Sequence, residues 1–169
     1  MSFISKNPKF YSTKPEPFDR STKVINPKGF DAELLGSTEN LNVINGYNDW
    51  SFHVKDVCLC GSIMVFPEAY FLWRARKATD ITIDSLKLIS TIHPTPSYVL
   101  VGTGENQLML PSEVVEHYSS LGITLESLST PNACSTFNFL LQERRPVALA
   151  ALTLDPDAYP LKTTPKPQL

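Results

Sequence analysis

A glycine-rich turn is the first place in the sequence where residue types and spacing suggest chemistry. Gly102-Thr103-Gly104 follows a short apolar run, and successive glycines after a buried strand can turn backbone N–H groups toward an anion such as phosphate. Position 107, however, is Gln where a dinucleotide-binding motif has its third glycine. Glu126 stands at roughly the spacing of a ribose contact. The pattern favours a structural turn, with ligand binding by Gly102, Thr103 and Gly104 as the alternative.

Cysteine spacing argues against a metal site. Cys58 and Cys60 would share one face of a strand and Cys134 would lie on a helix over the sheet, so the three thiols could in principle converge. Cys-x-Cys is nevertheless shorter than the usual gap between zinc ligands, and His53 falls on the other side of a hairpin turn. The pattern predicts buried cysteines that pack as small hydrophobes, and no metal ligand is assigned.

The remaining nucleophilic and titratable residues form no catalytic constellation. His93 precedes a proline in a loop and His117 lies on a helix away from its apolar positions, so both are expected to be exposed to solvent. Ser62 lacks the Gly-x-Ser-x-Gly frame of a nucleophile elbow. The sequence therefore assigns no catalytic residue and no cofactor.

One stretch combines aromatic bulk with positive charge. Aromatic and arginine side chains are enriched at the centres of protein interfaces, so this stretch supplies the candidates for partner contact. Its members are Tyr70, Phe71, Trp73, Arg74, Arg76 and Lys77. The alternative is that the aromatic residues divide between core and rim while the cations extend into water.

Composition narrows the class of protein. The chain has 169 residues, the length of about one domain, and its 15 basic and 17 acidic residues give a net charge of −2. That charge disfavours a general nucleic-acid binder. No apolar run approaches the roughly 18 residues of a membrane span. Three cysteines fit a reducing compartment better than a disulfide framework.

Proline and lysine mark the two ends of the chain. Four of the 14 prolines lie within residues 1–27 and four within 156–169, which predicts an extended or disordered segment over 1–40, a domain over 41–154 and a Pro-rich disordered tail over 155–169. The first fifteen residues carry three lysines and no acid, as mitochondrial targeting segments do, although they lack arginine. A plain disordered tail is the alternative.

The first half of the domain predicts a hairpin and a short helix. Residues 50–54 and 57–66 are rich in β-branched and aromatic side chains around Lys55-Asp56, which indicates a β-hairpin, with a bulge or a close backbone approach at Gly61. In the segment 82–92 only the first turns are expected to be helical, with Thr82 as the N-cap.

The second half alternates strands and helices. Residues 97–101, 123–125 and 147–152 are predicted strands, and the last is apolar throughout and so covered on both sides. A helix capped by Ser112 is expected to bury Val114, Val115, Tyr118 and Leu121. A second helix from Thr130-Pro131 is expected to bury Ala133, Phe137, Leu140 and Leu141. This order predicts one α/β domain with a mixed sheet, flanking helices and a leading hairpin.

Several short motifs are distributed over residues 43–154. They are Asn45-Gly46-Tyr47, Gly61-Ser62-Ile63, Pro67, Trp73, Asp80-Ile81-Thr82, Val101-Gly102-Thr103-Gly104, the segment 130–140 (Thr-Pro-Asn-Ala-Cys-Ser-Thr-Phe-Asn-Phe-Leu), Glu143 and Arg145. Together they resemble the single-domain family that includes mitochondrial respiratory complex I assembly factor three and has archaeal and bacterial members.

The resemblance implies a three-layer α/β domain with a central mixed sheet and no catalytic activity. It further implies a scaffold in the mitochondrial matrix, attached peripherally to the inner membrane without a transmembrane span, that pairs with complex I assembly factor four and escorts quinone-module subunits. Two positions depart from the family pattern. Arg144 stands where the family usually has Gly, and Ser135 stands where many members have Arg.

Overall fold

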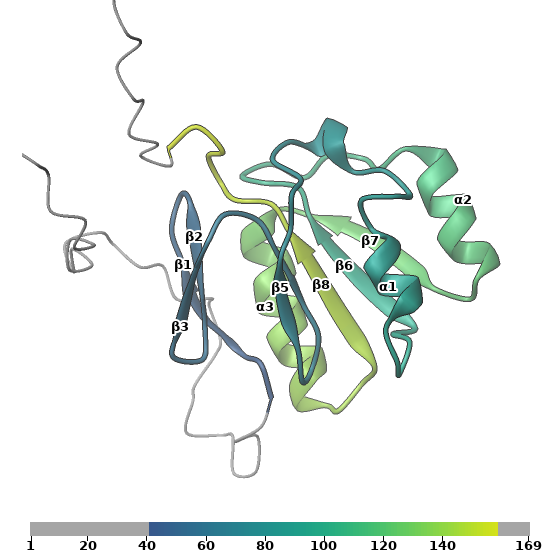
Figure 1. The fold of residues 1–169 in the computed structure, drawn as a ribbon, viewed down its shortest axis with the longest axis horizontal. Coiled ribbons are helices and arrows are strands. Elements are labelled where there is room, and N and C mark those ends of the chain that lie inside the picture. Colours follow the sequence, from purple (N-terminus) through teal and green to yellow (C-terminus); the bar gives the residue numbers. More distant parts are fainter. Residues whose placement is uncertain (1–40, 159–169) are drawn as a thin grey trace, which may run out of the picture.

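The structure, a computed structural model, describes residues 41–158. The predicted targeting signal and most of the predicted tail lie outside the described residues. The described elements follow in the order β1 (Ile44–Tyr47), β2 (Ser51–Val54), β3 (Val57–Cys60), β4 (Ile63–Val65), β5 (Tyr70–Leu72), α1 (Lys87–Thr91), β6 (Tyr98–Gly102), α2 (Ser112–Ser120), β7 (Thr124–Leu128), α3 (Thr130–Gln142) and β8 (Val147–Ala151), with a 3-10 turn at Ala78–Asp80 before α1 (Figure 1).

A mixed five-stranded sheet forms the centre of the domain. Its strand order is β5-β4-β8-β6-β7. β6 pairs in parallel with both β7 and β8, whereas β4 pairs antiparallel with β8 and β5. A separate antiparallel sheet has the order β1-β2-β3. The predicted α/β class and mixed central sheet are confirmed.

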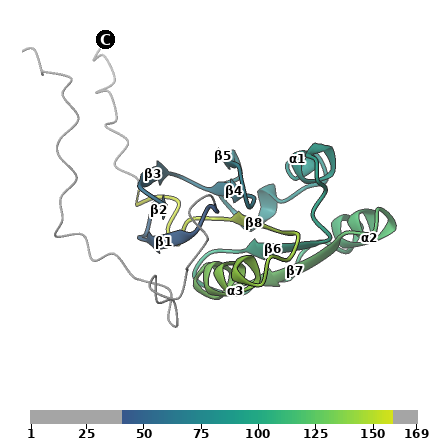
Figure 2. The same ribbon diagram turned by 90° about the horizontal axis from the view of Figure 1, so that it is seen from below.

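Helices cover both faces of the central sheet, which makes the domain three-layered. α3 lies on one face and α1 on the other, as the view from below shows (Figure 2). Successive side chains of a strand point to opposite faces. In β8, Leu149 accordingly belongs to the same buried cluster as Phe137 of α3, while Ala148 and Ala150 belong to the cluster that contains Ile89 of α1. This double coverage explains the uninterrupted apolar run of β8.

The helix α3 buries the face that its spacing predicts, since Ala133, Phe137, Leu140 and Leu141 all belong to the core. The buried Asn138 of α3 also forms hydrogen bonds with the backbone of β1, as a neighbouring strand would. The amide oxygen of Asn138 accepts from the N–H of Ile44 at 2.9 Å, and its amide nitrogen donates to the C=O of Ile44 at 2.9 Å. This pairing attaches the small sheet to α3.

The predicted hairpin is only partly correct. β2 and β3 do pair around Lys55-Asp56, but the second arm, expected to run from 57 to 66, ends at Gly61. There the chain leaves the small sheet and enters the central sheet as β4. Gly61 has φ +106° and no atom within 4 Å of where a Cβ would stand, so it serves a sharp change of direction and not a close backbone approach.

The short helix lies later than predicted. Thr82 does cap a turn, because its hydroxyl accepts from the N–H of Ser85 at 3.1 Å, but the helix α1 begins only at Lys87. In α2, Ser112 is the first helical residue and Pro111 holds the cap position. Val114 and Tyr118 are buried as expected, whereas Val115 and Leu121 are exposed, because α2 covers only the margin of the sheet beside β7.

The burial predicted for the cysteines is wrong for two of the three. Cys134 is buried on α3, and burial raises the pKa of its thiol. Cys58 and Cys60 are exposed, because β3 is the outer strand of the small sheet and both residues point away from the core face that Leu59 occupies. His93 and His117 are exposed, as predicted.

The segment after β8 packs back against the domain. The N–H of Asp155 donates to the C=O of Asp49 at 2.8 Å. The residues just after the predicted boundary at 154 therefore still contact the folded domain. Among the described residues, no helix is both long and apolar enough to cross a bilayer.

Candidate functional site

The strand β5 forms an open edge of the central sheet. In the register with β4, the N–H of Trp73 donates to Ser62 at 2.7 Å and the C=O of Ala69 accepts from Phe66 at 2.7 Å. In an antiparallel pair, the backbone N–H and C=O groups of alternate residues point toward the partner strand. Since those of Ala69 and Trp73 point toward β4, those of Tyr70 and Leu72 point outward. We refer to Tyr70–Leu72 with these outward groups as the β5 edge.

Two apolar side chains are exposed at the β5 edge. Phe71 is 41% exposed and Leu72 is 62% exposed. The ring of Phe71 meets the ring of Phe66 edge-on, with centroids 6.1 Å apart, and this contact holds it in place. Leu72 was not among the sequence candidates. The signal that could have found it is period-two alternation, which puts Leu72 on the opposite face from Phe71.

The other two aromatic candidates are less accessible. Tyr70 is half-buried against the core that α3 covers. Trp73 is only 8% exposed, and its indole N–H donates to the C=O of Ser85 at 2.9 Å. Of the three aromatic candidates, Trp73 is therefore buried, Tyr70 is half-buried and Phe71 is exposed.

The three cationic candidates follow β5 directly, and all three are exposed. We refer to Arg74, Arg76 and Lys77 as the cationic corner. Its backbone is fixed by Asp80, whose carboxylate accepts from the N–H groups of Arg76 at 2.9 Å and Lys77 at 3.0 Å. These backbone hydrogen bonds lower the pKa of Asp80.

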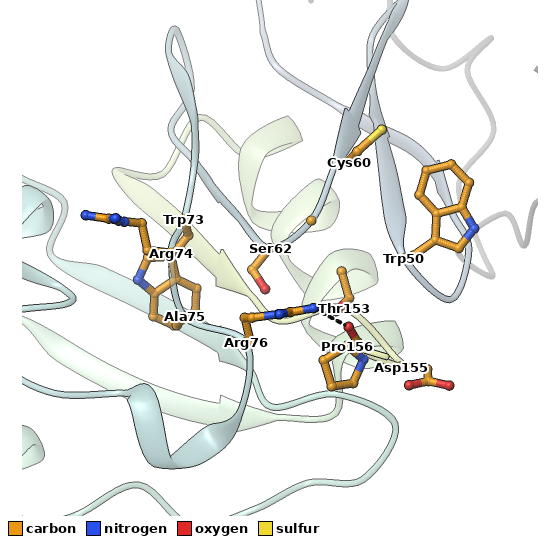
Figure 3. A pocket seen from close by; sticks show the side chains of 11 residues that line it. Trp50, Cys60, Ser62, Trp73, Arg74, Ala75, Arg76, Thr153, Asp155 and Pro156 are labelled. Carbon is orange, nitrogen blue, oxygen red and sulfur yellow. Dashed lines mark hydrogen bonds between the residues drawn. The ribbon is translucent and has the colours of Figure 1, made fainter. Parts of the chain in front are cut away.

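A pocket of about 280 Å³ lies beside the cationic corner (Figure 3). Trp50, Cys60, Ser62, Arg74 and Arg76 are among its lining residues. The guanidinium of Arg76 spans the pocket and donates to the C=O of Pro156 at 2.9 Å. The segment after β8 therefore forms one wall of the pocket.

A second pocket, of about 320 Å³, lies at the carboxyl ends of β6 and β8. Arg76, Lys77, Thr103 and Gly104 line it, so the structure brings the cationic corner and the glycine-rich turn together. The crossover through α2 covers one face of the sheet and the crossover through α3 covers the other. In open α/β sheets, ligands bind where crossovers diverge in this way.

The glycine-rich turn itself makes hydrogen bonds within the domain. The N–H of Thr103 donates to Leu128 at 2.9 Å, and the N–H of Gly104 donates to the Thr130 hydroxyl at 3.0 Å. A Cβ on Gly102 would lie 2.8 Å from that hydroxyl oxygen, so glycine permits close packing of β6 on α3. These contacts favour the structural reading of Gly102, Thr103 and Gly104.

The guanidinium and ammonium groups beside the two pockets are of a kind that binds carboxylates, but Asp155 also lines the first pocket and Glu105 the second. Glu126, the possible ribose contact, instead accepts from the hydroxyl of Tyr98. Within residues 41–158, no group of three or more His, Cys, Asp or Glu side chains is placed to hold a metal ion. His53 lies opposite Cys58 in the β2–β3 register, closer than the sequence spacing indicated.

The fold defines a class: a small three-layer α/β domain with a mixed central sheet. Solved bacterial structures share this fold. A crystal structure from Bordetella parapertussis is 32% identical and covers 67% of this chain and 96% of that chain, with a TM-score of 0.62. A solution structure from Bordetella pertussis, described as an Mth938-like domain, is 26% identical and covers 69% of this chain and 89% of that chain, with a TM-score of 0.63.

The chain belongs to the family described as "Protein of unknown function (DUF498/DUF598)", which it matches over residues 44–152. Among curated relatives, a protein of Danio rerio is 37% identical over 114 residues, which is 68% of this chain and 65% of the relative. A Homo sapiens protein is 35% identical over 109 residues, which is 64% of this chain and 59% of the relative.

Both relatives are named NADH dehydrogenase (ubiquinone) 1 alpha subcomplex assembly factor 3. The similarity spans less than two thirds of the length of these relatives. The family match over residues 44–152 covers the whole of the central sheet and its helices.

Proposed function

We propose that this protein is a non-enzymatic assembly factor for mitochondrial respiratory complex I. The observation that carries the proposal is the similarity to assembly factor 3 proteins of several animals, at 32–37% identity over most of the folded domain. The surface supports it, because the β5 edge and the cationic corner are suited to holding another polypeptide.

We further propose that the protein acts in the mitochondrial matrix at the surface of the inner membrane. There it would pair with complex I assembly factor four and hold subunits of the quinone module, and a targeting segment within residues 1–40 would deliver it. The support for these details is the resemblance in the segment 130–140 and the basic composition of residues 1–15.

The test is affinity purification of the tagged full-length chain from mitochondria of cells that make complex I. Recovery of complex I subunits, and a loss of assembled complex I when the chain is depleted, are the expected results. Recovery of no complex I subunit from such cells would contradict the proposal.

A small-ligand-binding enzyme or sensor that uses the loop from Gly102 to Gly104 is the second candidate function. The pocket at the carboxyl ends of β6 and β8 favours it, since Thr103 and Gly104 line that pocket together with Arg76 and Lys77. A thermal-shift panel of nucleotides and carboxylate metabolites tests this function directly. A flat response across the panel would remove it.

A further inference from the structure

We infer that the β5 edge and the cationic corner form one docking site, and that its occupant is an extended acidic segment of a partner protein that adds a strand to the central sheet beside β5. This inference rests on the proposed function and names how the partner is held.

The backbone supplies the first part of the argument. β5 is the outermost strand on its side of the sheet, and the outward N–H and C=O groups of Tyr70 and Leu72 repeat the spacing that a strand requires. An exposed edge of this kind pairs readily with another chain.

The opposite edge of the same sheet is a useful contrast. At β7, the C=O of Ser127 already accepts a hydrogen bond from the side chain of Gln107 at 2.8 Å. A strand arriving at β7 would have to displace that contact. The described hydrogen bonds therefore favour β5 over β7 as the docking edge.

Side chains supply the second part. Phe71 and Leu72 project from opposite faces of β5 and are both substantially exposed, so an added strand would cover apolar surface on each face. Alternate side chains of the occupant would pack against Phe71 on one face and Leu72 on the other.

Charge supplies the third part and specifies the chemistry of the occupant. Arg74, Arg76 and Lys77 follow β5 and are exposed, whereas Glu68 is exposed at the turn before β5. A strand lying along β5 therefore meets positive charge at one end. Acidic residues at that end of the occupant are favoured, and basic residues there are disfavoured.

A peptide experiment tests the chemistry on the full-length protein. The probe is a synthetic peptide of three glutamates followed by seven alternating valines and threonines, and the control peptide replaces the glutamates with lysines. At ten times the dissociation constant of the probe, amide hydrogen exchange at Tyr70 and Leu72 should slow by about tenfold. Exchange at Phe71 should stay unchanged, because its N–H faces β4.

Two variants and their controls test the site. Leu72→Pro removes one outward donor without a loss of β4 pairing and should weaken binding of the probe by about tenfold. Leu72→Val keeps the N–H and should bind the probe nearly as well as the wild type. Arg74→Glu should weaken binding of the probe and make that binding less dependent on salt. Lys87→Glu on α1 should change neither. The Arg74→Glu result stays informative if Leu72→Pro does not fold.

Three outcomes would overturn the inference: equal binding of the acidic and basic peptides, wild-type affinity of a folded Leu72→Pro, or a dimer of the chain in solution that Leu72→Pro dissociates. Purification from mitochondria separates this inference from the proposed function. If the wild type, Arg74→Glu and Leu72→Pro recover complex I subunits equally, the docking site is contradicted and the proposed function is not. Recovery by none of the proteins would defeat the proposed function.

Discussion

The helix α3 and the strand β5 belong to the same domain, yet they differ in how their polar groups are satisfied. On α3, the buried Thr130 hydroxyl donates to Leu152 at 2.7 Å and accepts from Gly104 at 3.0 Å, and Asn138 forms two hydrogen bonds with Ile44. At β5, no residue within 41–158 pairs with the outward backbone groups of Tyr70 and Leu72.

This difference separates the residues that maintain the fold from those available for contact. The segment 130–140, which carries most of the family resemblance, is occupied with internal packing and hydrogen bonds. The exposed residues of the β5 edge contribute little to the core. The segment 130–140 thus holds the fold, and the β5 edge is the part whose apolar side chains are exposed.

The largest expected effect tests the packing of α3. Phe137→Ala should lower the free energy of unfolding by about 3–5 kcal/mol, because it leaves a cavity between α3 and the sheet. Phe139→Ala is the matched control on the same helix: Phe139 is 59% exposed, so its loss should change stability by no more than about 0.5 kcal/mol. Urea unfolding measures both, and equal effects would contradict the burial difference.

A smaller loss of stability is expected when the hydrogen bonds that join α3 to the chain after β6 and β8 are removed. Thr130→Val keeps the shape of the side chain but leaves the N–H of Gly104 and one acceptor site of Leu152 unpaired, at a cost of about 1–3 kcal/mol. Thr136→Val, half-exposed on the same helix, is the control. An unchanged stability of Thr130→Val would remove the argument that the glycine-rich turn is held by α3.

A modest gain in stability is expected from a substitution just past the end of α3. Arg144 has φ +56°, a left-handed conformation that favours glycine. Arg144→Gly should therefore raise the free energy of unfolding by about 1 kcal/mol. Arg145→Gly, one position later, should not stabilise the protein. A higher melting temperature for Arg145→Gly than for Arg144→Gly would contradict this explanation.

The smallest effect on stability is expected at the β5 edge. Leu72→Thr introduces a β-branched residue, which suits a strand, and removes exposed apolar surface, so the free energy of unfolding should change by no more than about 0.5 kcal/mol. Recovery of partner proteins from mitochondria should nevertheless fall. A large loss of stability would show that Leu72 belongs to the structural part of the domain, and the comparison with α3 would fail.

Sequence patterns predicted the second half of the domain better than the first. The strands β6 and β8 and the helices α2 and α3 lie close to their predicted ranges, because their periodicity is long enough to distinguish helix from strand. β1 and β5 have four and three residues and were not predicted, since so short a run shows no reliable period.

The exposure of the candidate contact residues was predicted only in part. Phe71, Arg74 and Arg76 are exposed, whereas Trp73, named with them, belongs to the core. Residue type alone does not decide whether an aromatic ring is buried, because that depends on the layer that packs over it. Proximity of Thr103 to Arg76 was equally inaccessible from sequence, since they meet only through the ends of nonadjacent elements.

Local periodicity and turn residues by themselves determined an α/β domain with an apolar strand at its centre and a helix beginning at Thr130. Tertiary structure alone decided that the run from 57 to 66 divides between two sheets, that Cys58 and Cys60 face solvent, and that β5 is an edge. The physical reason is that alternation defines the two faces of a strand, whereas long-range pairing decides which face is covered and which strand has no further neighbour.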